Sequence, residues 1–290
     1  MKSILTLMIF VFFSVSCGIQ KKPNAKTNPT EKKALANPIK HEIRGKKVTI
    51  TDCDKSASGA LIIPSVIEGM SVNFIDYKAF SGCNALTSIT IPDSVISIEN
   101  EAFSYCTGLT SITIGNSVTS IGHEAFGNCG SLMSITIPES VTYIGMQAFY
   151  HCKSLTTITI PDSVSSIENY TFRGCKGLTV INISNSITSI ANQAFEGCNG
   201  LVNVTIPESV ASIGDQAFKD CNNLTAVTFL GDAPKITHTG FDISRRVNKM
   251  ETVEKEVFKN SISIIYRKSE AKGWGETFGG RPVKLISEKP

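Results

Sequence analysis

The sequence predicts an α/β repeat solenoid, in which 23-residue coils stack to form a parallel sheet on one face and short helical or 3-10 turns on the other. Three columns of residues support this prediction, because each recurs every 23 positions without a slip. The columns are Cys83, Cys106, Cys129, Cys152, Cys175, Cys198 and Cys221; Phe80, Phe103, Phe126, Phe149, Phe172, Phe195 and Phe218; and Leu86, Leu109, Leu132, Leu155, Leu178, Leu201 and Leu224. Self-similarity at a fixed period of about 20–29 residues is typical of solenoids.

The first part of each coil is predicted to be a short helical or 3-10 turn. In the coil that begins at Ile144, four apolar residues fall at positions i, i+4, i+5 and i+8, a spacing that gathers them on one helical face. They are Ile144, Ala148, Phe149 and Cys152. We therefore expect a layer of such turns with the phenylalanine and cysteine columns facing inward.

The second part of each coil is predicted to be a strand. Polar and apolar residues alternate from Thr157 to Ile160, so one side is buried and the other faces solvent. In four coils a proline follows and ends the strand, because proline has no N–H to donate. These prolines are Pro92, Pro138, Pro161 and Pro207. Stacked coils would cover one another's apolar side chains and place their strands side by side, about 4.8 Å apart.

The repeated unit I-G-x-x-A-F-x-x-C-x-x-L-T-x-I-x-I-P-x-S-V-x-x resembles the BspA-type leucine-rich repeats of bacterial surface proteins. The resemblance extends from about Thr51 to Phe229. It implies a leucine-rich-repeat arc and a role in adhesion or protein binding. Ordinary leucine-rich repeats carry an asparagine ladder after the strand, whereas this chain has a weaker hydrogen-bonding residue there, which leaves the curvature open. That residue is serine at Ser94, Ser117, Ser140, Ser163, Ser186 and Ser209.

The N-terminal residues predict export and lipid attachment. Lys2 precedes a largely apolar run from Ile4 to Phe13, which is too short to span a bilayer and is typical of a signal peptide. The next residues, Ser14-Val15-Ser16-Cys17, resemble a bacterial lipobox with serine where leucine is usual. We therefore expect a signal peptide over residues 1–16 and a lipidated Cys17 that holds the chain on a membrane. The alternative is a plain secretory signal with an incidental cysteine.

Residues 17–40 are predicted to form the lipidated cysteine and a flexible tether, because they are rich in Pro, Lys, Asn and Thr and poor in large apolar residues. Nine Lys or Arg and two Glu lie between Gly18 and Lys47, although the formal charge of the whole chain is only +3. Such a basic segment suits a linker beside a membrane. No aromatic residues interleave with its lysines, which argues against nucleic acid as a partner.

The remaining chain divides into three predicted parts. Residues 41–79 form an atypical N-terminal cap and a degenerate first coil, because the open end of a stack must be covered. Residues 80–229 form seven regular repeats. The pattern stops after Phe229, and residues 230–290, which contain Trp274, are expected to form a C-terminal cap.

The sequence predicts no catalytic, cofactor or metal site. The seven aligned cysteines are expected to be free, buried thiols that fill the place of leucine, since a straight column cannot converge on a metal; Cys53 lies outside their register. The four histidines lack nearby catalytic partners and are expected to be incidental. Acidic residues recur after the strands and could line a weak Ca²⁺ edge, although ordinary turn residues explain them. These are Asp93, Glu139, Asp162 and Glu208.

The outward strand positions are the predicted partner-binding surface. They are mostly hydroxyl-bearing and uncharged, and no deep pocket or aromatic cluster is evident among them, so we expect a protein or other macromolecule rather than a small ligand. The candidate residues are Ser88, Thr90, Ser111, Thr113, Ser134, Thr136, Thr157, Thr159, Asn182, Asn203 and Thr205. Val180, Ala226 and Thr228 share the same positions. A threonine-rich strand face also arises from strand propensity alone, with no bound partner.

Together these features predict a non-catalytic adhesion or protein-binding module, anchored at the outer membrane or cell surface. A periplasmic structural or assembly lipoprotein that acts as a rigid spacer is the main alternative. A carbohydrate-binding or ice-binding threonine face is a third.

Overall fold

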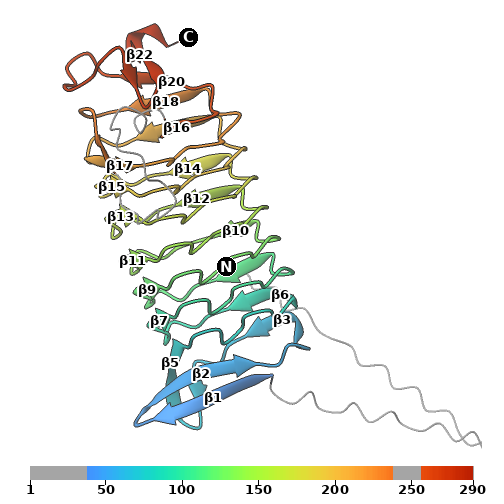
Figure 1. Cartoon of the computed structure of the whole chain (residues 1–290). Helices are drawn as coiled ribbons and strands as arrows, with labels where there is room; N and C mark the ends of the chain where they lie inside the picture. The colour runs from blue at the N-terminus through green and yellow to red at the C-terminus, as the bar shows by residue number, and fades with distance from the viewer. Residues whose placement is uncertain (1–37, 238–255, 290) are drawn as a thin grey trace, which may run out of the picture. The chain divides into compact units, whose positions relative to one another are not determined.

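The structure, a computed structural model, describes residues 38–237 and 256–289. The predicted signal peptide, Cys17 and nearly all of the tether fall in residues 1–37 and lie outside the described residues. Residues 37–290 form one compact unit, in which the coils succeed one another along a single axis (Figure 1). None of the helices in the described part of the chain is long and apolar enough to cross a membrane.

One side of the stack carries a line of parallel strands, as the alternation of polar and apolar residues predicts. We call this side of the stack the long-strand face. Neighbouring strands pair in register one coil apart, so Ile158 of one coil faces Ile181 of the next. A first sheet is completed by β14, and a second begins at β16. The strands are β3 (Ser58–Ile62), β6 (Ala85–Thr90), β8 (Ser111–Thr113), β10 (Ser134–Ile135), β12 (Thr157–Thr159), β14 (Val180–Asn182), β16 (Asn203–Ile206), β18 (Ala226–Phe229), β20 (Ile264–Arg267) and β22 (Arg281–Leu285).

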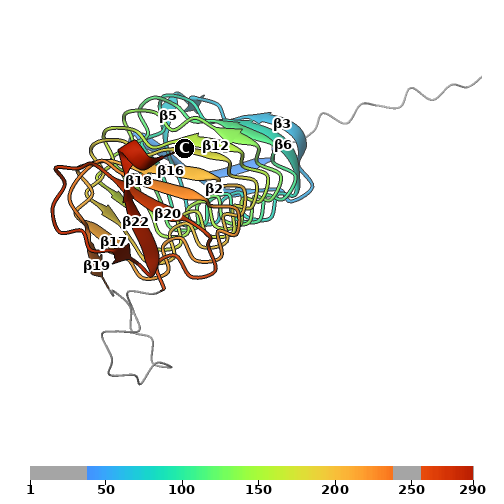
Figure 2. The same ribbon diagram turned by 90° about the horizontal axis from the view of Figure 1, so that it is seen from above.

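A second line of parallel strands runs along another side of the stack, and its members from β7 to β19 are only two or three residues long. It is also divided into two sheets, between β11 and β13. The strands are β2 (Lys47–Cys53), β5 (Met70–Ile75), β7 (Ser97–Ile98), β9 (Ser120–Ile121), β11 (Tyr143–Ile144), β13 (Ser166–Ile167), β15 (Ser189–Ile190), β17 (Ser212–Gly214) and β19 (Lys235–Thr237). Seen along the stacking axis, successive coils lie over one another (Figure 2).

Antiparallel strands close both ends of the stack. At the N-terminal end, β1 (Ile39–Arg44) pairs with β2, and the two-residue β4 (Val66–Ile67) pairs with β5. At the C-terminal end, β21 (Thr277–Phe278) pairs with β22, and the 3-10 helix η2 (Ile286–Glu288) follows. Trp274 packs edge-on against Phe229, with ring centroids 4.9 Å apart. Trp274, Phe278 and Val283 are partly buried and pack against the core at this end.

The core is a set of continuous columns, as the period predicts. All seven aligned phenylalanines are fully buried, and so are the cysteines and leucines of their columns, none of which is more than 1 % exposed. Successive phenylalanine rings stack with centroids 4.9–5.5 Å apart. A coil therefore buries its apolar groups only against its neighbours, which makes stability a property of the stack.

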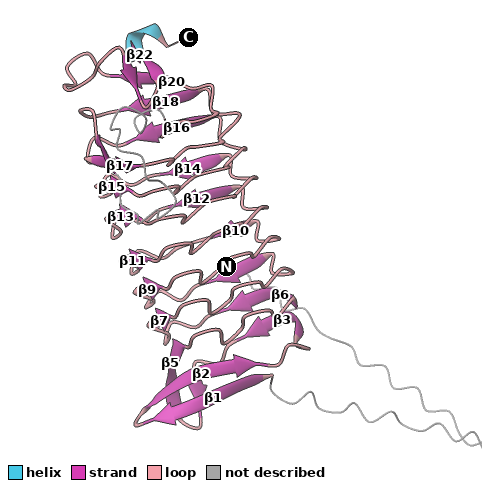
Figure 3. Cartoon of the chain, in the orientation of Figure 1, coloured by secondary structure: helices cyan, strands magenta, loops and turns pink. Residues whose placement is uncertain are grey.

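The prediction of helical or 3-10 turns on the opposite face is wrong. Figure 3 shows this stretch of each coil as loop, and among the described residues the one helical segment is η2. The segment is a chain of β-turns, which we call the turn face. The Tyr150 amide donates to the Gln147 carbonyl within the coil at 2.9 Å, whereas the Phe149 amide donates to the Thr171 carbonyl of the next coil at 3.0 Å.

Coil spacing explains why no helix forms there. An α-helix with its side chains is about 10–12 Å across, whereas the coils repeat every 4.9–5.5 Å along the phenylalanine column. Helices in successive coils would overlap. In the observed turns, every second backbone amide donates to a carbonyl of the neighbouring coil instead. The apolar residues at i, i+4, i+5 and i+8 are therefore turn residues that face the core.

The turns require left-handed backbone at two places in each coil. The residue two places before the phenylalanine has positive φ at Lys78, Glu101, Glu124, Gln147, Tyr170, Gln193 and Gln216. The residue two places after it has positive φ at Gly82, Tyr105, Asn128, His151, Gly174, Gly197, Asp220 and Asn260. Glycine, asparagine and aspartate tolerate this region best, which explains their recurrence in the second set.

Asn128 offers a direct test of the turn face. Its φ is 61°, so Asn128→Val would force a β-branched residue into the left-handed region, and we expect a loss of about 1–3 kcal/mol in the free energy of unfolding. Asn128→Gly should be neutral or slightly stabilising. Denaturant unfolding of both variants measures the difference, and equal stability of the two would contradict the assigned backbone.

The repeat continues beyond Phe229, where the sequence pattern was expected to stop. Phe258 is fully buried and stacks on Phe218 at 5.5 Å, so it extends the phenylalanine column by one ring. Ser261 stands three residues after Phe258, in the place of the cysteine, and is also buried. The step from Phe218 to Phe258 is 40 residues instead of 23, because extra chain is inserted between β19 and this coil.

Candidate functional site

The predicted partner-binding residues lie together on the long-strand face. Ten of the eleven are exposed, and Ser88 is half-buried. They alternate with buried isoleucines and valine, such as Ile158 between Thr157 and Thr159. The pairing of β6, β8, β10, β12 and β14 brings side chains 23 residues apart in sequence next to one another.

A second column of hydroxyls borders this surface and is used internally. Thr110, Thr156, Thr179 and Thr225 each donate their hydroxyl to a backbone carbonyl of the preceding coil, at 2.9–3.3 Å. The candidate residues behave differently. Among those described, one hydrogen bond joins two of their side chains, from Asn182 Nδ2 to Thr159 Oγ1 at 3.2 Å. Most candidate hydroxyls thus remain available to a partner.

The surface is uncharged but not uniformly polar. Met133, Val180 and Val202 project from it and are 53 %, 50 % and 46 % exposed. Val180 and Val202 also line a groove of about 420 Å³ where β14 and β16 do not pair. Asn182, Asn203 and Thr205 line the same groove, so it combines aliphatic contacts with amide and hydroxyl groups.

The C-terminal end of the long-strand face is covered. Ala226 and Thr228, which the alternation places outward, are only 7 % and 8 % exposed. The Lys289 ammonium reaches the Thr228 hydroxyl at 3.3 Å, and it also lies 5.6 Å from the Tyr266 ring centroid. The solvent-exposed part of the long-strand face therefore ends near β16. The alternation of residues in the strands does not predict this end, because it depends on the C-terminal residues that cover β18.

Several of the recurring serines and acidic residues make hydrogen bonds at the corners between strands. Four of the serines donate to a backbone carbonyl of the preceding coil, at 2.5–3.2 Å: Ser94, Ser140, Ser163 and Ser209. Asp93 accepts from the Asn116 amide at 2.7 Å, and Glu139 accepts from the Asp162 amide at 3.2 Å. Within the described residues, no three His, Cys, Asp or Glu side chains are placed to hold a metal ion.

The turn face has a smaller groove of about 230 Å³ beside His151. Its wall includes Glu196, a buried carboxylate that lies 3.0 Å from Arg173 Nε and 3.1 Å from Lys219 Nζ. Partial burial lowers the pKa of His151, and nearby Lys153 and Arg173 lower it further. The His151 ring packs over Gly174 of the next coil, where a Cβ would collide with it.

The cysteines are free and buried throughout the described residues. Cys106, Cys129, Cys152, Cys175, Cys198 and Cys221 each donate to the carbonyl of a phenylalanine 26 residues earlier, at 3.1–3.2 Å. Burial raises the pKa of all six, to about 12 for Cys106, Cys175 and Cys221. These thiols are structural, which agrees with their predicted role.

Comparisons with known proteins agree with the geometry. The family model described as "BspA type Leucine rich repeat region (6 copies)" matches residues 73–199 and 142–268. A leucine-rich repeat protein of T. pallidum is 34 % identical, with a TM-score of 0.62 over 65 % of this chain and 89 % of that one. No curated protein matches significantly.

A second similar structure is a leucine-rich cell surface protein of Faecalibacterium prausnitzii A2-165. It is 32 % identical, with a TM-score of 0.59 over 72 % of this chain. The match spans only 55 % of that protein's own length. The stacked 23-residue coils, the buried columns and the matched family model together show that this chain belongs to the BspA-type leucine-rich-repeat family.

Proposed function

We propose that the chain is a cell-surface module that binds a macromolecule through the long-strand face from β6 to β16. The observation that supports this proposal is the exposed, uncharged set of Ser, Thr and Asn side chains on adjoining coils. Six strands about 4.8 Å apart give a surface roughly 25 Å long. A partner would meet many weak polar contacts there, with aliphatic contacts at the groove between β14 and β16.

The same features favour a large partner over a small ligand or substrate. Small-molecule sites are usually concave and bury most of the ligand, whereas the groove between β14 and β16 is open to solvent. Modest affinity per molecule would be strengthened by many copies on one cell, since linked binding events raise the effective concentration. The chain is proposed to act without catalysis.

Display at the cell surface is the second part of the proposal. It is supported by the sequence of residues 1–40, with its expected signal peptide, lipidated Cys17 and tether. It is also supported by similarity to the F. prausnitzii protein, which is described as a leucine-rich cell surface protein.

Protease treatment of intact cells tests the display. Surface protein should be degraded while a periplasmic marker survives, and Cys17→Ser should release the chain from the membrane fraction. Complete protection of the wild-type chain in intact cells, with degradation after the outer membrane is opened, would instead favour the periplasmic spacer. Retention of Cys17→Ser in the membrane would contradict lipidation.

A further inference from the structure

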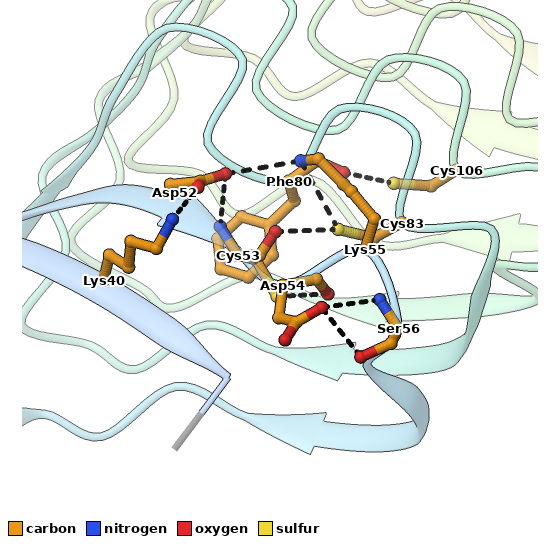
Figure 4. A network of polar contacts seen from close by, with 9 residues as sticks. All are labelled: Lys40, Asp52, Cys53, Asp54, Lys55, Ser56, Phe80, Cys83 and Cys106. Carbon is orange, nitrogen blue, oxygen red and sulfur yellow. Dashed lines mark hydrogen bonds and ion pairs between the residues drawn. The ribbon is translucent and has the colours of Figure 1, made fainter. Parts of the chain in front are cut away.

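The cysteine column ends differently at its N-terminal end. Each of the six cysteines from Cys106 onward donates to a phenylalanine carbonyl 26 residues earlier. Cys83 departs from this pattern, because its carbonyl partner lies 30 residues earlier instead of 26. Its sulfur lies 3.9 Å from the Cys53 carbonyl and 3.9 Å from Lys55 Nζ (Figure 4).

Cys53, the last residue of β2, sits directly beside Cys83. The Cys83 thiol lies 3.9 Å from the Cys53 carbonyl oxygen, the Cys53 thiol lies 3.7 Å from the Asp54 carbonyl oxygen, and both cysteine side chains are buried. The neighbouring Cys53 side chain and the nearby Lys55 ammonium lower the pKa of Cys83, whereas the neighbouring Cys83 side chain and burial raise the pKa of Cys53. Cys83 is thus the one described cysteine whose thiolate is stabilised, and the thiolate is the nucleophilic form.

The surroundings of Lys55 support this arrangement. Lys55 Nζ lies 3.5 Å from Asp52, which also pairs with Lys40 at 2.7 Å. The Lys55 side chain is 52 % exposed, so a partly exposed cation lies against the buried Cys83 sulfur. The central cysteines are instead covered by a complete coil on each side.

We propose that Cys53 and Cys83 form a dithiol–disulfide pair that is oxidised by thiol–disulfide exchange with another disulfide. The Cys83 thiolate attacks one sulfur of the oxidant, forming a mixed disulfide and releasing one thiolate, which takes up a proton. Cys53 then loses its proton and attacks the Cys83 sulfur, expelling the second thiol. Two protein thiols become one disulfide, and one oxidant disulfide becomes two thiols.

The new bond would join the N-terminal cap to the first regular coil. Solenoid ends have a neighbour on one side only and open more readily than central coils. A covalent link between β2 and the turn that contains Cys83 would restrain this opening. The oxidant is either a small-molecule disulfide or the active-site disulfide of an oxidoreductase, and both supply the same chemistry.

The test uses the reduced full-length chain. It is incubated with oxidised and reduced glutathione over a range of ratios, or with a thioredoxin-fold oxidoreductase in its disulfide form, then quenched with an alkylating agent and mapped by mass spectrometry. A Cys53–Cys83 peptide is expected, while Cys129 and Cys152 stay reduced. If only glutathione disulfide or only the oxidoreductase produces the Cys53–Cys83 disulfide, that result identifies which kind of oxidant the pair uses.

Two variants separate the steps. Cys53→Ser should accumulate a mixed disulfide at Cys83, because the second thiol is missing. Lys55→Met, a change at an exposed side chain, should slow the first step by roughly threefold to tenfold, since a neighbouring cation favours the thiolate. In the oxidised protein, amide exchange in β1 and β2 should slow while exchange in β12 is unchanged.

The proposal would be overturned if no Cys53–Cys83 peptide formed at any ratio. It would also be overturned if Cys83 reacted no faster than Cys152 in the folded chain, or if Cys53→Ser left Cys83 unmodified. These outcomes are independent of partner binding by the long-strand face.

Discussion

Replacing Phe149 with alanine is expected to lower the free energy of unfolding by about 3–5 kcal/mol, as for other buried aromatic deletions. The Phe149 side chain is fully buried. Its ring stacks on Phe126 and Phe172 with centroids 5.5 Å away on each side. The variant therefore loses contacts with two coils at once, and the 23-residue period leaves little freedom to close the resulting cavity.

Denaturant unfolding, followed by circular dichroism, measures this loss. Thr157→Ala is the matched control in an adjoining part of the same coil, and its exposed side chain should change stability by no more than about 0.5 kcal/mol. A loss below about 1 kcal/mol for Phe149→Ala would show that the phenylalanine column is not the core of the stack.

The triple change of Thr136, Thr157 and Thr159 to lysine is expected to weaken partner binding at least about tenfold, which corresponds to about 1.4 kcal/mol. All three side chains are exposed near the middle of the long-strand face. Lysine would add three long, strongly hydrated cations to a surface that carries no charge. Because no buried contact changes, the fold should be retained.

A chain that begins at Pro38 is suitable for this experiment, since residues 37–290 form one compact unit. The partner is first recovered by cross-linking on intact cells, and its affinity for wild-type and variant chains is then compared. The control places the same charge on exposed residues of the shorter-strand side, as Thr119→Lys, Thr142→Lys and Thr188→Lys. Equal affinities of the wild-type chain and the long-strand variant would reject this face as the binding surface.

The strict period explains how much of the fold is predictable from sequence. Because the phenylalanine, cysteine and leucine columns share one 23-residue step, only one register buries all three. The period of two from Thr157 to Ile160 then determines which side chains face outward. The outward position of the candidate residues and the free, buried state of the cysteines follow from these two periods.

The turn face was predicted wrongly because inward spacing does not distinguish a helix from a series of turns. The residues two places after the phenylalanine carried a usable signal. Gly82, Asn128, Gly174, Gly197 and Asp220 are types that tolerate positive φ, and such residues interrupt helices. The residue types at this position therefore favour turns over a helix, despite the apolar spacing.

Other features depend on contacts between parts of the chain that do not repeat. Phe258 was missed because the chain inserted before it breaks the period, although E-V-F-K-N-S retains the form of the unit. The covering of Ala226 and Thr228 depends on how the C-terminal residues fold back. The contact of Cys53 with Cys83 depends on where the N-terminal hairpin ends, and no repeat position encodes it.

The alternating hydrogen bonds of the turn face have an evolutionary consequence. Every coil offers its neighbours nearly the same donors, acceptors and apolar groups, so two coils that were not originally adjacent can meet without a new interface. Recombination that adds or removes one 23-residue unit would then change copy number while preserving the fold. Relatives could therefore differ in the length of the long-strand face, in steps of about 4.8 Å per coil.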